Sequence, residues 1–152
     1  MFPRPVVRLS PSLIFSVLLF IFSAPALLAQ QSLTGARPLE PGGETIEREI
    51  IAGESQAYEV KMEAGQCLRL DLEQRGLDLR LVSYGPGGNR VLEFNGTGSP
   101  LGHTDLSLVA DLSGVYKIEI LPVKIVGAAG HYQLQAVELR GANEQDRSRF
   151  AA

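Results

Sequence analysis

The stretch "CLRLDLEQRGLDLRLVSY", Cys67 to Tyr84, decides the fold because its leucines recur at every second position. Successive side chains of a β-strand point to opposite faces, so this spacing gives a strand one buried face and one face in water. The leucines that form the buried face are Leu68, Leu70, Leu72, Leu77, Leu79 and Leu81. The stretch therefore predicts two half-buried strands, with a turn at the "QRG" segment between them.

The segment that follows, "GPGGNR" from Gly85 to Arg90, fits either a phosphate-binding loop or a turn. A phosphate-binding loop needs a helix behind it, whose free amide groups and dipole meet the anion. Here the next residues are "VLEF", which is a strand pattern. Pro86 fixes a backbone angle that suits a turn, and Gly87 or Gly88 can take a positive φ. The segment therefore predicts a turn between two antiparallel strands.

The alternation of apolar and polar residues extends in both directions, from Glu44 to Leu139. Its further inward residues are Ile46, Ile50, Tyr58, Val60, Met62, Leu106, Leu108, Ala110, Tyr116, Ile118, Ile120, Tyr132, Leu134 and Ala136. Turn signals such as "AGES", "EAGQ" and "GAAG" interrupt it at intervals of roughly 8–12 residues, which is typical of a β-sandwich or small barrel. We expect an all-β fold, an antiparallel β-sandwich of seven or eight strands. The strand order stays open, because Greek-key and jelly-roll windings share this pattern.

The first 29 residues have the layout of a secretory signal peptide. Arg4 and Arg8 precede an apolar run of about 17 residues that ends in small residues. Cleavage is expected after Ala29, with Ala26 as the second choice, and an uncleaved membrane anchor is the alternative. We therefore expect a signal-peptide helix at 1–29, a linker at 30–43, and export to the periplasm or the extracellular space. Contact with the membrane would be transient, through the signal peptide.

Charge and cysteine content exclude several classes of protein. Without Arg4 and Arg8, 12 basic residues remain against 17 acidic ones, a net charge of −5. This balance argues against nucleic-acid binding, because neither a basic stripe nor a basic patch is present. Cys67 is the only cysteine, so an internal disulfide is impossible and core packing must hold the domain together.

The last residues, 141–152, change from alternation to a polar, helix-forming composition. Asn143 can cap a helix there, and Asp146 three residues later resembles the second member of a capping box. The segment predicts the beginning of a helix.

Candidate catalytic residues are few, since His103 and His131 are the only imidazoles. Cys67 with either histidine could form a thiol dyad, but no cysteine-peptidase signature surrounds it, and a small apolar packing role is favoured. Ser99, His103 and Asp105 lie close in sequence, but triads are assembled from spatial neighbours and no nucleophile elbow is present. We predict no catalytic residues and no cofactor.

Asp71, Asp78 and Asp105 are the candidate calcium ligands, because calcium binds carboxylate and carbonyl oxygens. A solvated acidic surface is the favoured interpretation, and Asp78 is expected to accept hydrogen bonds from neighbouring loop amides. Two histidines so far apart lack the local spacing of a zinc site. Tyr84 and Phe94 flank the glycine-rich turn; they could form an exposed contact pair, and bracing of the strands is preferred.

The segment "AGQCLRLDLEQRGLDLRLVSYGPGGNRV" and the later "SGVY" resemble the bacterial pre-peptidase C-terminal (PPC) domain. "LEPGGETIEREIIAGESQAYEV" is more similar still to a domain at the start of large secreted bacterial proteins. In those proteins, tetratricopeptide repeats and a caspase-like CHAT peptidase follow. The resemblance covers residues 39–152 and implies a jelly-roll β-sandwich without catalytic residues of its own.

The expected organisation is thus a PPC-like β-sandwich at 44–140 and the start of a helical, repeat-like segment at 141–152. The expected function is that of a non-catalytic, exported accessory or interaction domain, the N-terminal module of a larger repeat protein. Its partner would be another protein or the further domains of a larger chain. A calcium- or polysaccharide-binding module is the alternative, and a small hydrolase the remote one.

Overall fold

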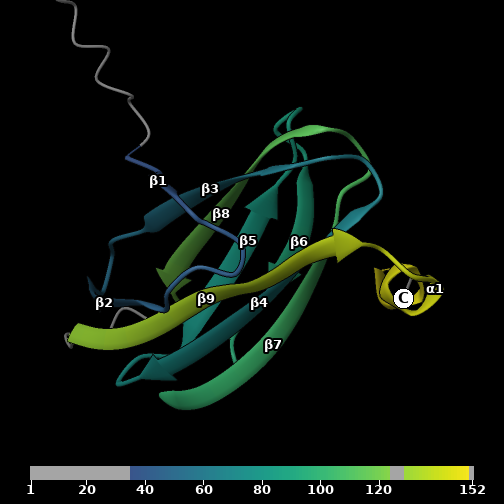
Figure 1. Ribbon diagram of the computed structural model, residues 1–152. Helices are drawn as coiled ribbons and strands as arrows, with labels where there is room; N and C mark the ends of the chain where they lie inside the picture. Colours follow the sequence, from purple (N-terminus) through teal and green to yellow (C-terminus); the bar gives the residue numbers. More distant parts are fainter. Residues whose placement is uncertain (1–34, 124–128, 151–152) are drawn as a thin grey trace, which may run out of the picture. The chain divides into compact units, whose positions relative to one another are not determined.

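Nine strands and one short helix make up the residues that the computed structural model describes, 35–123 and 129–150 (Figure 1). The strands are β1 (Arg37–Pro38), β2 (Ile46–Ile51), β3 (Gln56–Met62), β4 (Gln66–Arg75), β5 (Leu79–Tyr84), β6 (Arg90–Phe94), β7 (Leu101–Val109), β8 (Gly114–Pro122) and β9 (Ala129–Gly141). The helix α1 is Glu144–Phe150. The predicted signal peptide, 1–29, and residues 30–34 of the predicted linker lie outside the described residues. Within the described ranges, no helix is long and apolar enough to cross a membrane.

The strands form two sheets, with the orders β1-β3-β8-β5-β6 and β2-β9-β4-β7. Strands β2 to β9 pair as a nested set, β2 with β9, β3 with β8, β4 with β7 and β5 with β6. This is one long antiparallel hairpin rolled up so that alternate pairs fall in opposite sheets, which is the jelly-roll winding. The all-β sandwich prediction is confirmed, and the strand order that the sequence left open is that of a jelly roll.

The "GPGGNR" segment is the tip of the rolled hairpin. The amide of Gly85 donates to the carbonyl of Asn89 at 2.8 Å, and the amide of Gly88 donates to the carbonyl of Gly85 at 2.9 Å. Gly88 has a φ of 76°, a conformation that residues with a Cβ rarely adopt. The predicted turn between antiparallel strands is therefore confirmed.

The strand count exceeds the expected seven or eight because of β1. Arg37 and Pro38 pair in parallel with Tyr58 and Glu59 of β3, inside the segment predicted to be a linker. Two residues are too few to show an alternation of apolar and polar side chains, so the sequence pattern gave no sign of this strand. Leu39 continues the attachment, since its amide donates to the carbonyl of Glu59 at 2.8 Å and its side chain is 3% exposed.

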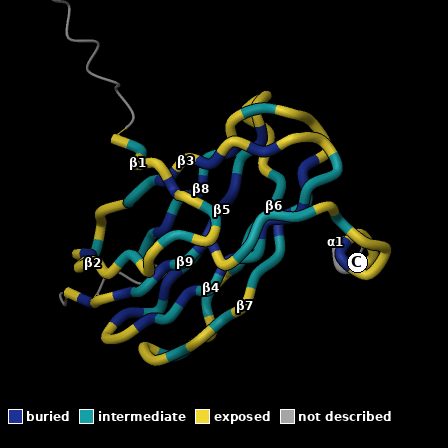
Figure 2. Tube along the Cα trace, in the orientation of Figure 1, coloured by how far each residue is buried: buried dark blue, intermediate teal, exposed yellow. Residues whose placement is uncertain are grey.

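The core lies between the two sheets and consists of the inward residues of the alternating pattern (Figure 2). Fully or almost fully buried members are Tyr58, Val60, Met62, Leu68, Leu70, Leu72, Leu79, Leu81, Leu108, Tyr116, Ile118, Ile120, Tyr132 and Leu134. Burial of one such side chain stabilises the fold by roughly 1.5–3 kcal/mol. The hydroxyls of Tyr58 and Tyr132 lie 2.6 Å apart, so a hydrogen bond between these two side chains links the sheets inside this core.

Candidate functional site

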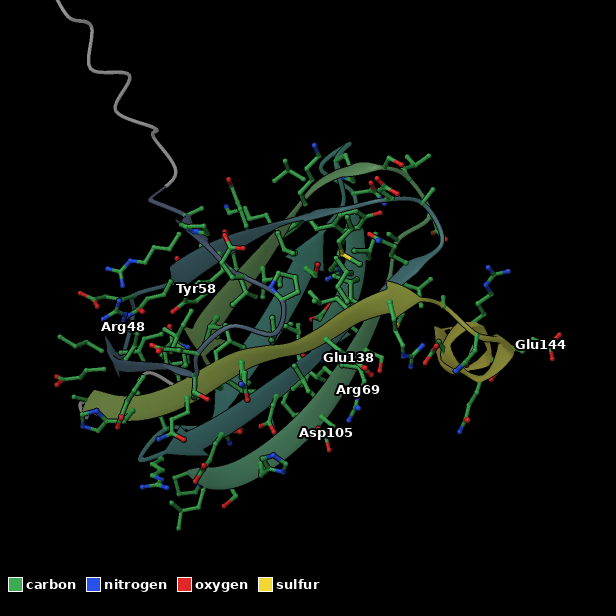
Figure 3. All side chains as sticks on the ribbon, viewed as in Figure 1. Arg48, Tyr58, Arg69, Asp105, Glu138 and Glu144 are labelled. Atoms are coloured by element: carbon green, nitrogen blue, oxygen red, sulfur yellow. The ribbon has the colours of Figure 1, made fainter. Side chains whose placement is uncertain are left out.

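The outer face of the four-stranded sheet is polar, because its side chains are the ones between the inward leucines. We define this outer face by Arg69, Asp71 and Glu73 of β4, His103, Asp105 and Ser107 of β7, and Gln133, Gln135 and Glu138 of β9. Cross-strand pairing sets these residues in rows, and directly paired residues share a face. Figure 3 shows Arg69, Asp105 and Glu138 projecting from this sheet.

Three side chains of the outer face converge: Asp71, His103 and Asp105. Asp71 is the direct cross-strand partner of Asp105, and His103 pairs with the next outward residue of β4, Glu73. The Nε2 atom of His103 lies 2.8 Å from Oδ1 of Asp71. One ligating atom from each of the three residues lies within 4.8 Å of the other two. This cluster contains two of the three predicted calcium candidates and adds an imidazole.

The cluster's charges are partly balanced within the sheet. The hydrogen bond to Asp71, and then the charge of that carboxylate, raise the pKa of His103 above its usual value. Arg69 lies 4.0 Å from Asp105 and 3.4 Å from Glu138. All of these side chains are at least a third exposed, and exposed ion pairs contribute little to stability.

Asp78, the third calcium candidate, is not a member of this cluster. It lies between β4 and β5, and its Oδ1 accepts hydrogen bonds from the amide of Thr97 at 2.9 Å and from Nε2 of Gln74 at 3.1 Å. Asp78 therefore binds loop amide groups, as the preferred interpretation expected. Asp71, Asp78 and Asp105 do not form a single set of ligands.

Gln74 is a structural residue that the sequence pattern did not reveal. It continues the inward phase of β4 and is 2% exposed, so its polar groups need partners. Its Nε2 also donates to Oγ1 of Thr97 at 3.0 Å and to the carbonyl of Ser99 at 2.7 Å, and its Oε1 accepts from the amide of Leu79 at 3.0 Å. The buried side chain of Gln74 thus holds the loop before β7, through Thr97 and Ser99, against the start of β5.

Tyr84 and Phe94 do not form the expected pair. Phe94 lies opposite Leu81, a core residue, and packs against the core. Tyr84 is three positions after Leu81 on β5, so it points to the other face of the sheet, opposite Arg90. Both the bracing interpretation and the shared contact surface are therefore wrong, because the register separates the two rings to opposite faces.

The thiol of Cys67 lies near the start of β4, whereas the two histidines lie on neighbouring strands beside the last residues of β4. Cys67 pairs with Val109 and Arg140, whereas His103 pairs with Glu73 and His131 with Arg75. Cys67 is fully buried, and this burial raises the pKa of its thiol, so the nucleophilic thiolate is disfavoured at neutral pH. The dyad considered from the sequence does not form. In the loop, Ser99 Oγ accepts from the amide of Leu101, and the imidazole of His103 turns to Asp71, so the triad of Ser99, His103 and Asp105 is not assembled either.

Cys67 is buried although it points away from the core, because the segment that leads into α1 covers it. Arg140 donates two hydrogen bonds to the carboxylate of Asp146, at 2.6 and 3.1 Å. Asn143 and Asp146 cap the helix reciprocally. The backbone amide of Asn143 donates to the carboxylate of Asp146 at 2.8 Å, and the backbone amide of Asp146 donates to the side-chain carbonyl of Asn143 at 2.9 Å. The capping box predicted from these two residues is confirmed, and Arg140 is the partner that the sequence did not reveal.

Asp146 is the most strongly perturbed acid of this junction. Hydrogen bonds from Arg140, and then from the Asn143 backbone, lower its pKa from 3.8 to about 2. Its side chain is 11% exposed, and it accepts hydrogen bonds both from the amide of Asn143 at the start of the helix and from Arg140 at the end of β9. One carboxylate therefore fixes α1 to the four-stranded sheet.

Three surface depressions are lined by other residues. One lies next to α1 and is lined by Arg90, Val109, Asp111 and Arg147, among others. A second adjoins Arg37, Lys117 and Glu119, and a third adjoins Pro38, Leu39 and Val115. The walls of these three contain neither Cys67 nor a histidine.

The described residues thus define an all-β protein of the jelly-roll sandwich class, with a polar outer face on one sheet and a short helix fixed to it. No protein-family model and no curated protein matches the sequence. Among solved structures, the chain is similar to the pre-peptidase C-terminal domain of a collagenase from Bacillus anthracis, with 14% identity and a TM-score of 0.47. It is also similar to PliG from Aeromonas hydrophila, a periplasmic inhibitor of g-type lysozyme, with 13% identity and a TM-score of 0.48. Each comparison covers 69% of this chain and 94% of the other one.

Sequence reasoning found two members of the outer-face cluster but not their relation. His103 was considered as a base for Cys67 or Ser99, and with His131 as a zinc ligand, but not as a neighbour of Asp71. The pairing of β4 with β7 decides that Asp71 is its neighbour, and no local pattern encodes that register. A signal was present in "HTD" of β7, which places a histidine and an aspartate on the same face two residues apart.

Proposed function

We propose that this chain is a non-catalytic β-sandwich domain of an exported protein. In this proposal the sandwich is an accessory module that holds a following helical segment in a fixed orientation, and the helix side of the module contacts the partner. The partner is another protein or a further domain of the same protein.

The observation that carries the proposal is the junction between β9 and α1. A flexible linker would not need a buried carboxylate with a lowered pKa, whereas here Asp146 joins the helix start to Arg140 of the sheet. Charged hydrogen bonds of this kind are stronger than neutral ones, and they fix direction as well as distance. The exposed residues of α1, among them Glu144, Gln145, Arg147 and Ser148, are left free for contacts.

Two features of the sequence support the remainder of the proposal. The basic start, apolar run and small-residue end of residues 1–29 support export. The resemblance of residues 39–152 to the domain that precedes tetratricopeptide repeats supports a helical repeat segment after the sandwich. The wide separation of Cys67 from both histidines along β4 supports a role that is not catalytic.

The proposal is tested by site-specific photo-crosslinking in the host that produces the chain. A photoreactive residue replaces Gln145 or Ser148 on α1, and a matched control carries it at Glu54. Glu54 is also exposed but follows Ile51, which pairs with Ala129 at the far end of β9. We expect crosslinked products from the α1 positions and none from Glu54, in protein recovered from the exported fraction with its leader removed after Ala29.

Equal crosslinking from Glu54 and α1, or none from either, would contradict the contact role of the helix side. Recovery of uncleaved protein from the cytoplasm would contradict export.

A further inference from the structure

The pairing of Asp71 with Asp105 is unusual for the outer face of a sheet. Like charges directly opposite each other on neighbouring strands are destabilising. Here the two carboxylates are direct cross-strand partners at the centre of the β4–β7 ladder, with Arg69 and His103 as the nearest bases. The arrangement brings two anionic oxygens and one imidazole nitrogen to one place on rigid strands.

The donor set fits a transition-metal ion better than calcium. Calcium takes six to eight oxygen ligands, whereas zinc binds imidazole nitrogen at about 2.0–2.1 Å and carboxylate oxygen at about 2.0–2.2 Å, usually with four ligands. Two such ligands on one tetrahedral ion lie about 3.3 Å apart, given those bond lengths. In the present structure Nε2 of His103 lies 2.8 Å from Oδ1 of Asp71, and the ligating atoms of all three residues lie within 4.8 Å of one another. Small rotations of the side chains would therefore bring these atoms to the spacing that a bound ion requires.

The side chains around the cluster can accommodate a metal ion. The side chain of Asp105 is 63% exposed, so its carboxylate can turn without displacing packed atoms. Arg69 would lose its contact of 4.0 Å with Asp105, but it keeps its closer partner Glu138 at 3.4 Å. The metal ion would take the place of the proton between Nε2 of His103 and Oδ1 of Asp71, so both side chains would remain in contact with a cation.

We propose that Asp71, His103 and Asp105 bind one divalent transition-metal ion, such as Zn²⁺, on the outer face of the four-stranded sheet. Three protein ligands leave one position open, for water or for a donor group of a partner molecule. The site is independent of the contact role proposed for α1, because α1 follows Gly141 at the Gln66 end of β4 whereas Asp71 lies at the centre of that strand.

The test is a calorimetric titration of the purified protein with Zn²⁺, together with Co²⁺ absorption spectroscopy, which reports the coordination geometry of the bound ion. The wild type is expected to bind one ion, and His103→Ala and Asp71→Asn are each expected to weaken binding at least tenfold. His131→Ala is the matched control, because His131 is the other histidine and lies on the same sheet opposite Arg75. It is expected to bind as the wild type does, and Arg69→Ala is expected to bind more tightly because a competing cation is gone.

Failure of the wild type to bind one ion saturably would overturn the proposal. Equal losses in the His103 and His131 variants would also overturn it, since they would indicate nonspecific imidazole binding. Thermal melting of each variant without metal shows whether the fold is intact. None of these outcomes changes the crosslinks expected from α1, so failures of the two proposals are distinguishable.

Discussion

The two halves of the outer face share the strands β4, β7 and β9 but differ in what lies over them. At the end where β9 meets α1, Asp146 pairs with Arg140 above a fully buried Cys67. Further along the same strands, Asp71 pairs with His103 in contact with solvent, with side chains that are 35% and 56% exposed. We call these the covered half and the open half.

The comparison shows that a carboxylate paired with a base has a different role when it is shielded from solvent than when it is exposed. Removing one partner of a shielded pair leaves an uncompensated charge and is costly, so the covered half fixes the helix. An exposed pair contributes little and exchanges easily, so the open half is available to a ligand.

The largest loss of stability is expected from a substitution in the core, which underlies both halves of the outer face. Leu70 is fully buried between the sheets, so Leu70→Ala should lower the free energy of unfolding by about 2–5 kcal/mol. Asp71→Asn, at the next position of the same strand but on the open half, should change it by less than about 0.5 kcal/mol. Urea denaturation measures the free energy of unfolding of both variants. Similar losses in the two would contradict the expectation that the outer face contributes little to stability.

A smaller effect is expected from the cap of the covered half. Asn143→Ala removes a side-chain acceptor from the start of α1 and should cost about 1 kcal/mol. Because α1 would then detach more often, Cys67 should react faster with a thiol reagent. Gln145→Ala on the exposed side of α1 is the control, and it should leave the rate unchanged; equal rates in all three proteins would mean that α1 does not protect the thiol.

The last prediction concerns acid, and its effect is confined to low pH. The pKa of Asp146 is lowered in the folded state, so its stabilising contribution is complete above its unfolded value of 3.8 and disappears as the pH falls through about 2. The difference in melting temperature between the wild type and Asp146→Asn should therefore be constant above pH 4 and shrink towards pH 2. A difference that does not change over this range would show that the pKa of Asp146 is not lowered by folding.

The sequence was sufficient for whatever depends on local periodicity. The inward residues of each strand, the turn at Gly85–Arg90 and the Asn143–Asp146 cap are determined by neighbours within a few positions. The jelly-roll order was not determined by that pattern, because alternation specifies the face of a residue but not its neighbouring strand. For the same reason Tyr84 and Phe94 were wrongly paired, and Arg140 and His103 were not connected with their acidic partners.

Backbone ¹⁵N relaxation of α1 compared with β4 tests most directly whether the covered half is part of the sandwich. A helix fixed by Asp146 should give order parameters near 0.85 for residues 144–148, about the value of rigid backbone in the strands. Values below about 0.6 in α1, with rigid strands, would contradict the fixed junction on which the proposed function depends.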